Sequence, residues 1–172
     1  MLIETAIDSV RISLMSQHRV IVLKDPNAPR FLPIWIGPFE ADAITIELQG
    51  VEVGRPLTHD LLRSVIETLD AEIEQVAITT LRNDTFFAQI TLLTGNGRRL
   101  QVDSRPSDAI ALAVRARVPI YVEEDVMDQA AITPEPDLET GETGGPTAGE
   151  KAEAPEAFRE FLEGLNLEGF GN

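Results

Sequence analysis

Residues 103–114 read DSRPSDAIALAV, a polar segment with a proline at position 106 that runs directly into six apolar residues. Proline is favoured in the first turn of a helix, so the segment predicts a helix that begins close to Pro106. Residues 109–114 are apolar on every side of that helix, whereas a surface helix carries a single apolar stripe. We therefore predict a buried helix, enclosed by a sheet or by a second subunit.

The triplet Asp-Ala-Ile at 108–110 has a copy 66 residues earlier, at 42–44. Segments that predict strands precede both copies at the same offset, and the first pair alternates apolar and polar residues as half-buried strands do. These segments are 10–14 and 76–80, 18–23 and 84–89, and 31–36 and 97–102. Only the triplet is identical, so the repeat rests on the shared offset. The pattern predicts an α+β fold with a duplicated β-β-β-α unit, whose mainly antiparallel sheet curves around the buried helix.

A second helix is predicted after the first copy, at Thr58 to Asp70. Its apolar side chains share one face, as in a helix at a protein surface, and they are Leu61, Leu62, Val65, Ile66 and Leu69. The corresponding segment of the second half, 124–132, predicts a shorter helix.

The composition changes near Thr133. Residues 133–155 are rich in Pro, Gly, Thr and Glu, which predicts an acidic disordered linker. Residues 156–172 contain an apolar stripe at helical spacing, formed by Phe158, Phe161, Leu162 and Leu165. We predict a domain at 1–132, the linker, and a short C-terminal amphipathic helix that docks on the domain or on a protein partner.

The negative charge is concentrated in the tail. Residues 1–122 hold 15 acidic and 12 basic residues, whereas residues 123–172 hold 14 acidic and 2 basic residues. The net charge of −15 over 172 residues therefore says little about what the domain binds. No extended basic stripe is present, so we expect contact with nucleic acid to be weak and salt-sensitive.

The residue counts exclude several classes of protein. With no Cys and two His, the chain has no disulfide framework and no Cys/His zinc site. No apolar run approaches the ~18 residues of a membrane span, and the first residues lack the pattern of a signal peptide. A glycine-rich phosphate loop is also missing. We expect a cytoplasmic protein without membrane contact and without an organic cofactor.

Several stretches of the chain resemble the bifunctional nuclease domain family, which is named for activity on RNA and DNA. The stretches are LPIWIG at 32–37, EADAI at 40–44, RPLTHDLL at 55–62, SRPSDAIALAVRARVPIYV at 104–122 and EEDVM at 123–127. The resemblance runs from about residue 3 to residue 131, and the F-x-x-F-L pattern of the tail also matches. It implies a compact α+β domain that forms homo-oligomers, a dimer or larger, and has nuclease activity. It implies no particular set of catalytic residues.

Two carboxylates occupy corresponding places in the repeat, Asp42 and Asp108, each near the start of a helix. If the halves pack about a pseudo-two-fold axis, the two side chains approach each other and hold Mg²⁺ or Mn²⁺ for phosphodiester hydrolysis, with Glu40 as a further metal ligand. Asp103 is another oxygen donor nearby. The alternative is that these carboxylates complement the helix dipole or cap the helix.

A phosphate-binding segment is predicted at Ser104 to Asp108. Backbone N–H groups at the helix start, together with Arg105 and Ser107, offer donors to a phosphate. The same residues also suit a helix start in which either serine is the cap.

His59 is a candidate catalytic residue because it follows a predicted Thr58 cap and titrates in the range that a general base needs. Arg55, four residues earlier, is a candidate phosphate ligand. The alternative is a surface histidine beside Asp60, with the Asp60 carboxylate complementing the dipole.

Two functions remain open from the sequence. The first is a nuclease of little sequence preference, in which Asp42, Asp108 and His59 are catalytic and Arg55, Arg105 and Ser107 bind phosphate. The second is a non-catalytic oligomeric interaction module whose tail helix binds a protein partner.

Overall fold

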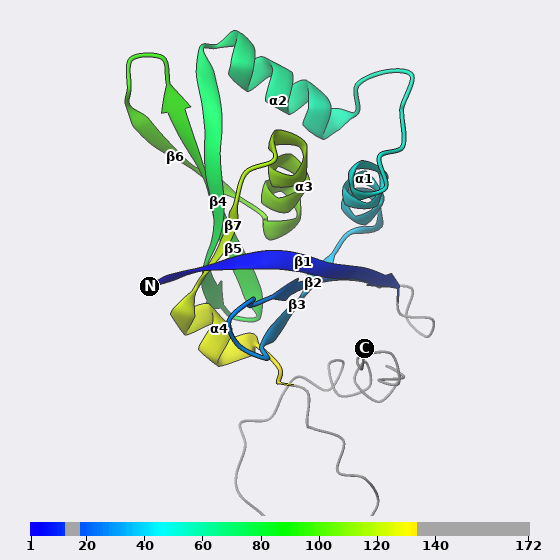
Figure 1. The fold of residues 1–172 in the computed structure, drawn as a ribbon, viewed down its shortest axis with the longest axis vertical. Helices are drawn as coiled ribbons and strands as arrows, with labels where there is room; N and C mark the ends of the chain where they lie inside the picture. Colours follow the sequence, from blue (N-terminus) through cyan, green and yellow to red (C-terminus); the bar gives the residue numbers. More distant parts are fainter. Residues whose placement is uncertain (13–17, 134–172) are drawn as a thin grey trace, which may run out of the picture.

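A computed structural model of the chain describes residues 1–12 and 18–133. These residues form one seven-stranded sheet with four helices (Figure 1). The strands are β1 (Leu2–Ile12), β2 (Arg19–Lys24), β3 (Phe31–Ile36), β4 (Ala71–Arg82), β5 (Thr85–Thr94), β6 (Arg99–Ser104) and β7 (Ile120–Glu123). The helices are α1 (Pro38–Leu48), α2 (Thr58–Thr68), α3 (Pro106–Ala116) and α4 (Glu124–Ala130). The predicted α+β class is confirmed.

The sheet consists of two three-stranded meanders joined by β7. The strand order is β3-β2-β1-β7-β4-β5-β6, so the second meander mirrors the first across the centre of the sheet. All neighbouring strands are antiparallel except β4 and β7, which are parallel. In the view of Figure 1, β1 crosses β4, as expected for a strongly twisted sheet. The repeated strand-strand-strand-helix order of the sequence is therefore present in the structure.

One strand of the sheet is absent from the sequence-based prediction. β7 has only four residues, Ile120-Tyr121-Val122-Glu123, which is too short to show a period. Its conformation is set by two partners distant in sequence, because it pairs with β1 on one side and with β4 on the other.

The helix predicted to be buried is α3. Eight of its eleven residues are buried, among them Ile110 and Leu112 with no exposed surface. Alanines at positions 109, 111 and 113 leave room for close packing, and α3 contacts α1, α2, β3, β4 and β5. The enclosed helix of the prediction is confirmed within a single chain.

The apolar face predicted for α2 lies mostly in solvent. Leu61 is 59 % exposed and Leu69, just beyond the helix, is 74 % exposed, with Leu62 and Val65 also exposed. Ile66 packs partly against the core, and His59 is the buried residue of this helix. The helix ends at Thr68, before Asp70 adopts a left-handed conformation with φ of 57°. In the described chain, the amphipathic face of α2 is therefore not the face that contacts the core.

The end of one further predicted helix also differs from the structure, and two predictions lie outside the described residues. α4 ends at Ala130 rather than at residue 132, because Ile132 forms a bridge with Phe31 beside the edge strand β3. The linker at 133–155 and the C-terminal helix at 156–172 lie beyond Thr133, outside the described residues. Among the helices that the structure describes, none has the length and apolar character needed to cross a membrane.

Candidate active site

The N-terminal turns of three helices converge on one cluster of charged side chains. Glu40 lies in the first turn of α1, His59 in the first turn of α2 and Asp108 in the first turn of α3. Arg105 is the residue that immediately precedes α3. Each N-terminal turn presents backbone N–H groups and a partial positive charge, so the cluster lies where negative charge is stabilised.

A continuous series of polar contacts links the four side chains. His59 Nε2 lies 3.1 Å from Asp108 Oδ1. Arg105 donates from Nε to Asp108 Oδ2 at 2.6 Å and from Nη2 to Glu40 Oε1 at 2.8 Å. Four of the sequence-predicted site residues are therefore joined: His59, Asp108, Arg105 and Glu40.

Asp108 remains ionised at neutral pH. Partial burial raises the pKa of its carboxyl group, but the hydrogen bonds from Arg105 and His59 and their charges outweigh burial, and the pKa lies below the ordinary value for Asp. The same contacts raise the pKa of Arg105, with Asp108 contributing more than Glu40. A carboxylate can only accept hydrogen bonds, so His59 Nε2 carries the hydrogen and donates it to Asp108. Whenever the imidazole is in its neutral form, this bond leaves the lone pair on Nδ1.

Water can reach the second nitrogen of His59. The residue is 8 % exposed, and no described residue bonds to its Nδ1. Among the described residues, every buried side-chain nitrogen or oxygen has a hydrogen-bond partner. Nδ1 must therefore be accessible to solvent. Asp108 orients the ring, and Nδ1 is the nitrogen that can take a proton.

The structural counterpart of Asp108 is Glu40 rather than Asp42. Pro38 begins α1 and Pro106 begins α3, so these helices are offset by 68 residues and not by the 66 of the Asp-Ala-Ile triplet. Glu40 and Asp108 are each the third residue of their helix. Asp42 lies two residues further on, exposed, and forms none of the ion pairs of the described chain.

The proposed metal ligands do not form a metal-binding group in this chain. The described residues contain no group of three or more His, Cys, Asp or Glu side chains that could hold a metal ion. Glu40 and Asp108 both bind the guanidinium of Arg105, which occupies one oxygen of each carboxylate and offsets part of their charge. The arrangement of Asp42, Asp108 and Glu40 therefore does not fit Mg²⁺ or Mn²⁺ within a single chain.

The remaining predicted residues lie around the cluster. Ser107 is 6 % exposed on α3, which leaves little of its surface for a phosphate. Neither predicted serine caps α3, whose N-cap is Arg105 without a side-chain cap bond, and α2 begins after Leu57 rather than after a Thr58 cap. Arg55 is exposed in the loop before α2.

Arg115 is an important residue that sequence reasoning missed. Its side chain is 2 % exposed and donates to Asp60 Oδ1 at 2.6 Å, to the carbonyl oxygen of Ala111 at 2.9 Å and to that of Ala43 at 3.1 Å. It therefore ties α1 and α2 to α3, which carries it. Burial raises the pKa of Asp60, but the Leu57 N–H and Arg115 outweigh burial, and the pKa is lowered. The available signal is the position of Arg115 directly after the apolar run of α3, since a buried arginine needs several acceptors.

Comparison with known proteins gives a family for the chain. The family model described as the bifunctional nuclease domain matches residues 21–135. An uncharacterised protein of Mycobacterium tuberculosis is 40 % identical over 167 residues, 97 % of each chain. Bifunctional nuclease 2 of Arabidopsis thaliana is 30 % identical over 108 residues, 61 % of this chain and 33 % of the plant protein. Bifunctional nuclease 1 of Oryza sativa subsp. japonica is 28 % identical over 116 residues, 66 % of this chain and 35 % of that protein. The chain belongs to the bifunctional nuclease domain family.

Proposed function

We propose that the protein is a nuclease that hydrolyses phosphodiester bonds in RNA and DNA with little sequence preference, and that His59, Asp108 and Arg105 carry the reaction. The observation that supports this most directly is the contact between His59 Nε2 and Asp108, which orients a histidine whose other nitrogen is reachable by water. Membership of a family named for nuclease activity supports the same proposal.

His59 activates the attacking water in this proposal. Its Nδ1 removes a proton while the water oxygen forms a bond to phosphorus, and the imidazolium that results is stabilised by the Asp108 carboxylate. As the bond from phosphorus to the leaving oxygen breaks, the proton returns from Nδ1 to that oxygen. Since water is the nucleophile, no ribose 2′-hydroxyl is needed, and both RNA and DNA are substrates.

Arg105 stabilises the phosphoryl charge that develops in the transition state. Its side chain is 66 % exposed, and its contacts with Asp108 and Glu40 leave further N–H donors of the guanidinium for a phosphate oxygen. The three helix N-termini around it favour an anion at the same place.

Single substitutions at the two candidate carboxylates test this proposal. We expect purified protein to cleave end-labelled single-stranded RNA and DNA, Asp108→Asn to reduce the rate about 100-fold or more, and Asp42→Asn to leave it unchanged. Parallel reactions with Mg²⁺, Mn²⁺ and EDTA test the metal requirement expected from the sequence. An equal loss of cleavage rate in Asp108→Asn and Asp42→Asn, which neither a metal ion nor a change of pH restores, would refute the role proposed for Asp108.

A second function is favoured by one specific observation. The exposed apolar face of α2, which includes Leu61 and Val65, is typical of a surface that contacts another protein. The alternative proposal is a non-catalytic oligomeric module that uses this face. No cleavage by the wild-type protein with either metal would favour it.

A further inference from the structure

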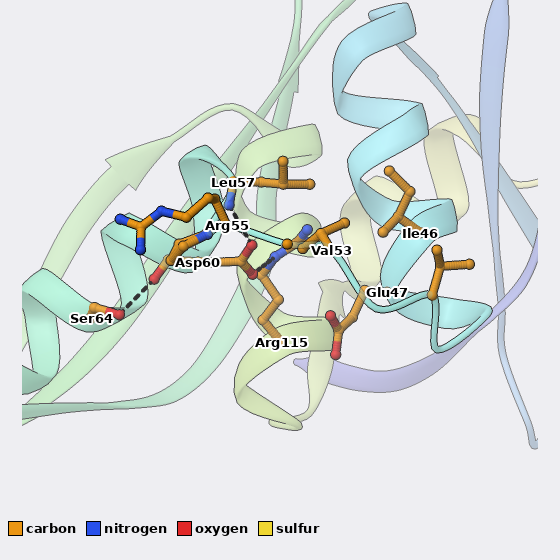
Figure 2. A pocket seen from close by; sticks show the side chains of 11 residues that line it. Ile46, Glu47, Val53, Arg55, Leu57, Asp60, Ser64 and Arg115 are labelled. Carbon is orange, nitrogen blue, oxygen red and sulfur yellow. Dashed lines mark hydrogen bonds and ion pairs between the residues drawn. The ribbon is translucent and has the colours of Figure 1, made fainter.

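A pocket of about 290 Å³ lies between the end of α1, the loop that follows and the first turns of α2 (Figure 2). Its apolar wall consists of Ile46, Val51, Val53 and Leu57. The Asp60–Arg115 ion pair forms part of the same lining. This volume is at the small end of ligand sites, so the pocket suits one flat ring system rather than a large ligand.

Two charged side chains in the pocket lining are open to a ligand. Neither Glu47 nor Arg55 forms a side-chain hydrogen bond or ion pair within the described residues. The carboxylate of Asp60, in contrast, is occupied by Arg115 and by the backbone N–H of Leu57. Figure 2 shows Glu47 and Arg55 on opposite sides of the Asp60–Arg115 pair. A ligand with N–H donors at one end and a phosphate at the other matches this pair of charges.

The pocket lies next to the candidate active site. Leu57 and Asp60, which line it, flank His59 in the first turn of α2. On α3, Arg115 follows Asp108 by seven residues, which is at most about 10 Å along the helix axis. A stacked strand advances about 3.4 Å per nucleotide, so the pocket lies within about three nucleotides of the reacting phosphate.

We propose that this pocket binds an unpaired nucleobase of a single strand whose backbone passes His59 and Asp108, with guanine as the preferred base. The inference deepens the proposed nuclease function and rests on it. The apolar wall contacts the faces of the ring, Glu47 accepts N–H groups of its edge, and Arg55 contacts a neighbouring phosphate. Guanine presents two adjacent N–H donors on its Watson–Crick edge, which suit both oxygens of one carboxylate. In a duplex this edge is paired, so the pocket selects single strands.

Binding of matched oligonucleotides tests the proposal with the full-length protein. The probes are fluorescein-labelled hexathymidylates in which one internal position carries guanine, hypoxanthine or an abasic site, and a gel verifies that they remain intact. Hypoxanthine differs from guanine only by the missing 2-amino group. We expect guanine to bind about tenfold more tightly than the abasic probe, with hypoxanthine between them. Equal affinity for the three probes would overturn the proposal.

Two variants, each with a matched control, locate the effect in the pocket. Glu47→Gln should abolish the difference between guanine and hypoxanthine, whereas Glu52→Gln, an exposed position outside the pocket lining, should retain it. Ser64→Leu should fill the pocket and equalise all three probes. Thr68→Leu is its control, because both hydroxyls bond to a carbonyl oxygen four residues earlier in α2 and only Ser64 lines the pocket. Undiminished discrimination in both Glu47→Gln and Ser64→Leu would place base binding elsewhere.

Different outcomes would refute the base-binding pocket and the nuclease function. His59→Asn should abolish cleavage and retain the preference for guanine in binding. Wild-type protein that discriminates the probes without cleaving any strand would refute the nuclease function alone. Cleavage of single strands and duplexes at the same rate, with no difference among the probes, would refute the base pocket alone.

Discussion

Asp108 has a different role from the other carboxylates near the helix starts. It accepts hydrogen bonds from both Arg105 and His59, whereas the Glu40 side chain bonds to Arg105 alone among the described residues and Asp42 is exposed. Arg105, His59 and the N-terminus of α3 stabilise the ionised carboxylate of Asp108 despite its partial burial. A charged Asp108 in turn holds His59 in the tautomer that leaves Nδ1 ready to accept a proton.

The lowered pKa of Asp108 predicts a particular dependence of stability on pH. Its ionised form is favoured by the folded state, so its contribution is complete above the ordinary Asp pKa of about 3.9 and is lost as pH falls through the lower folded value. We expect Asp108→Asn to reduce the free energy of unfolding by about 2 kcal/mol at neutral pH, and this difference to shrink below about pH 4. Urea unfolding at several pH values measures it, with Asp42→Asn as the control. If the difference in free energy of unfolding between the wild-type protein and Asp108→Asn stays constant below pH 4, the lowered pKa of Asp108 is contradicted.

The arrangement of α1, α2 and α3 depends on Arg115. Its guanidinium reaches a carbonyl of α1, a carboxylate of α2 and a carbonyl of its own helix. Since α2 carries His59 and α3 carries Asp108, the same contacts hold in place the two side chains that we propose as catalytic.

Removal of Arg115 should therefore affect both stability and activity. We expect Arg115→Met to lower the free energy of unfolding by about 3 kcal/mol, because Asp60 and two carbonyl groups lose a buried partner. Arg82→Met, at an exposed position at the end of β4, should change stability by less than about 0.5 kcal/mol. Chemical denaturation of both variants measures the difference, and equal stability would show that the Arg115 contacts are dispensable.

The sequence predicts elements with a strong period and misses those set by distant partners. The apolar run at 109–114 identifies α3, and the three strand-like segments of each half identify six strands. β7 is too short for a period, and the two-residue difference in offset that pairs Glu40 with Asp108 is hidden by the identical triplets. The contact of His59 with Asp108 joins helices 49 residues apart. The sequence names both residues as candidates but does not predict that they meet, because spacing along a chain does not determine which side chains are in contact.

Residues 1–12 and 18–133 form an open sheet with three helices gathered at one side of β1 and a fourth at the other (Figure 1). Its edges are β3 and β6, so both meanders present an outer strand. Three exposed apolar side chains lie on α2, namely Leu61, Leu62 and Val65, of which Leu61 and Val65 are 59 % and 45 % exposed. The homo-oligomer expected from the sequence would cover them.

Charged substitutions on α2 test for that homo-oligomer. We expect the wild-type chain to sediment as a dimer or larger, and Leu61→Glu with Val65→Glu to sediment as a folded monomer, because both side chains are exposed in one chain. Leu100→Glu, at a similarly exposed leucine of β6, is the control. A monomeric wild-type protein, or dissociation by Leu100→Glu alone, would exclude α2 as the interface.

The acidic tail should weaken binding of polyanions to the whole protein. We expect a chain without residues 134–172 to retain the far-UV spectrum of the folded domain and to bind single-stranded DNA more tightly at low salt, with the gain lost at high salt. Unchanged affinity would show that the tail does not shield the basic side chains.

The most direct test of the active site is the cleavage rate of a labelled single strand by His59→Asn and by His18→Asn. These are the only two histidines of the chain, and His18 is exposed and packs edge-to-face against Trp35 at 5.4 Å. We predict a loss of about 100-fold or more for His59→Asn and a wild-type rate for His18→Asn. A wild-type rate for His59→Asn would contradict the catalytic role of the His59–Asp108 pair.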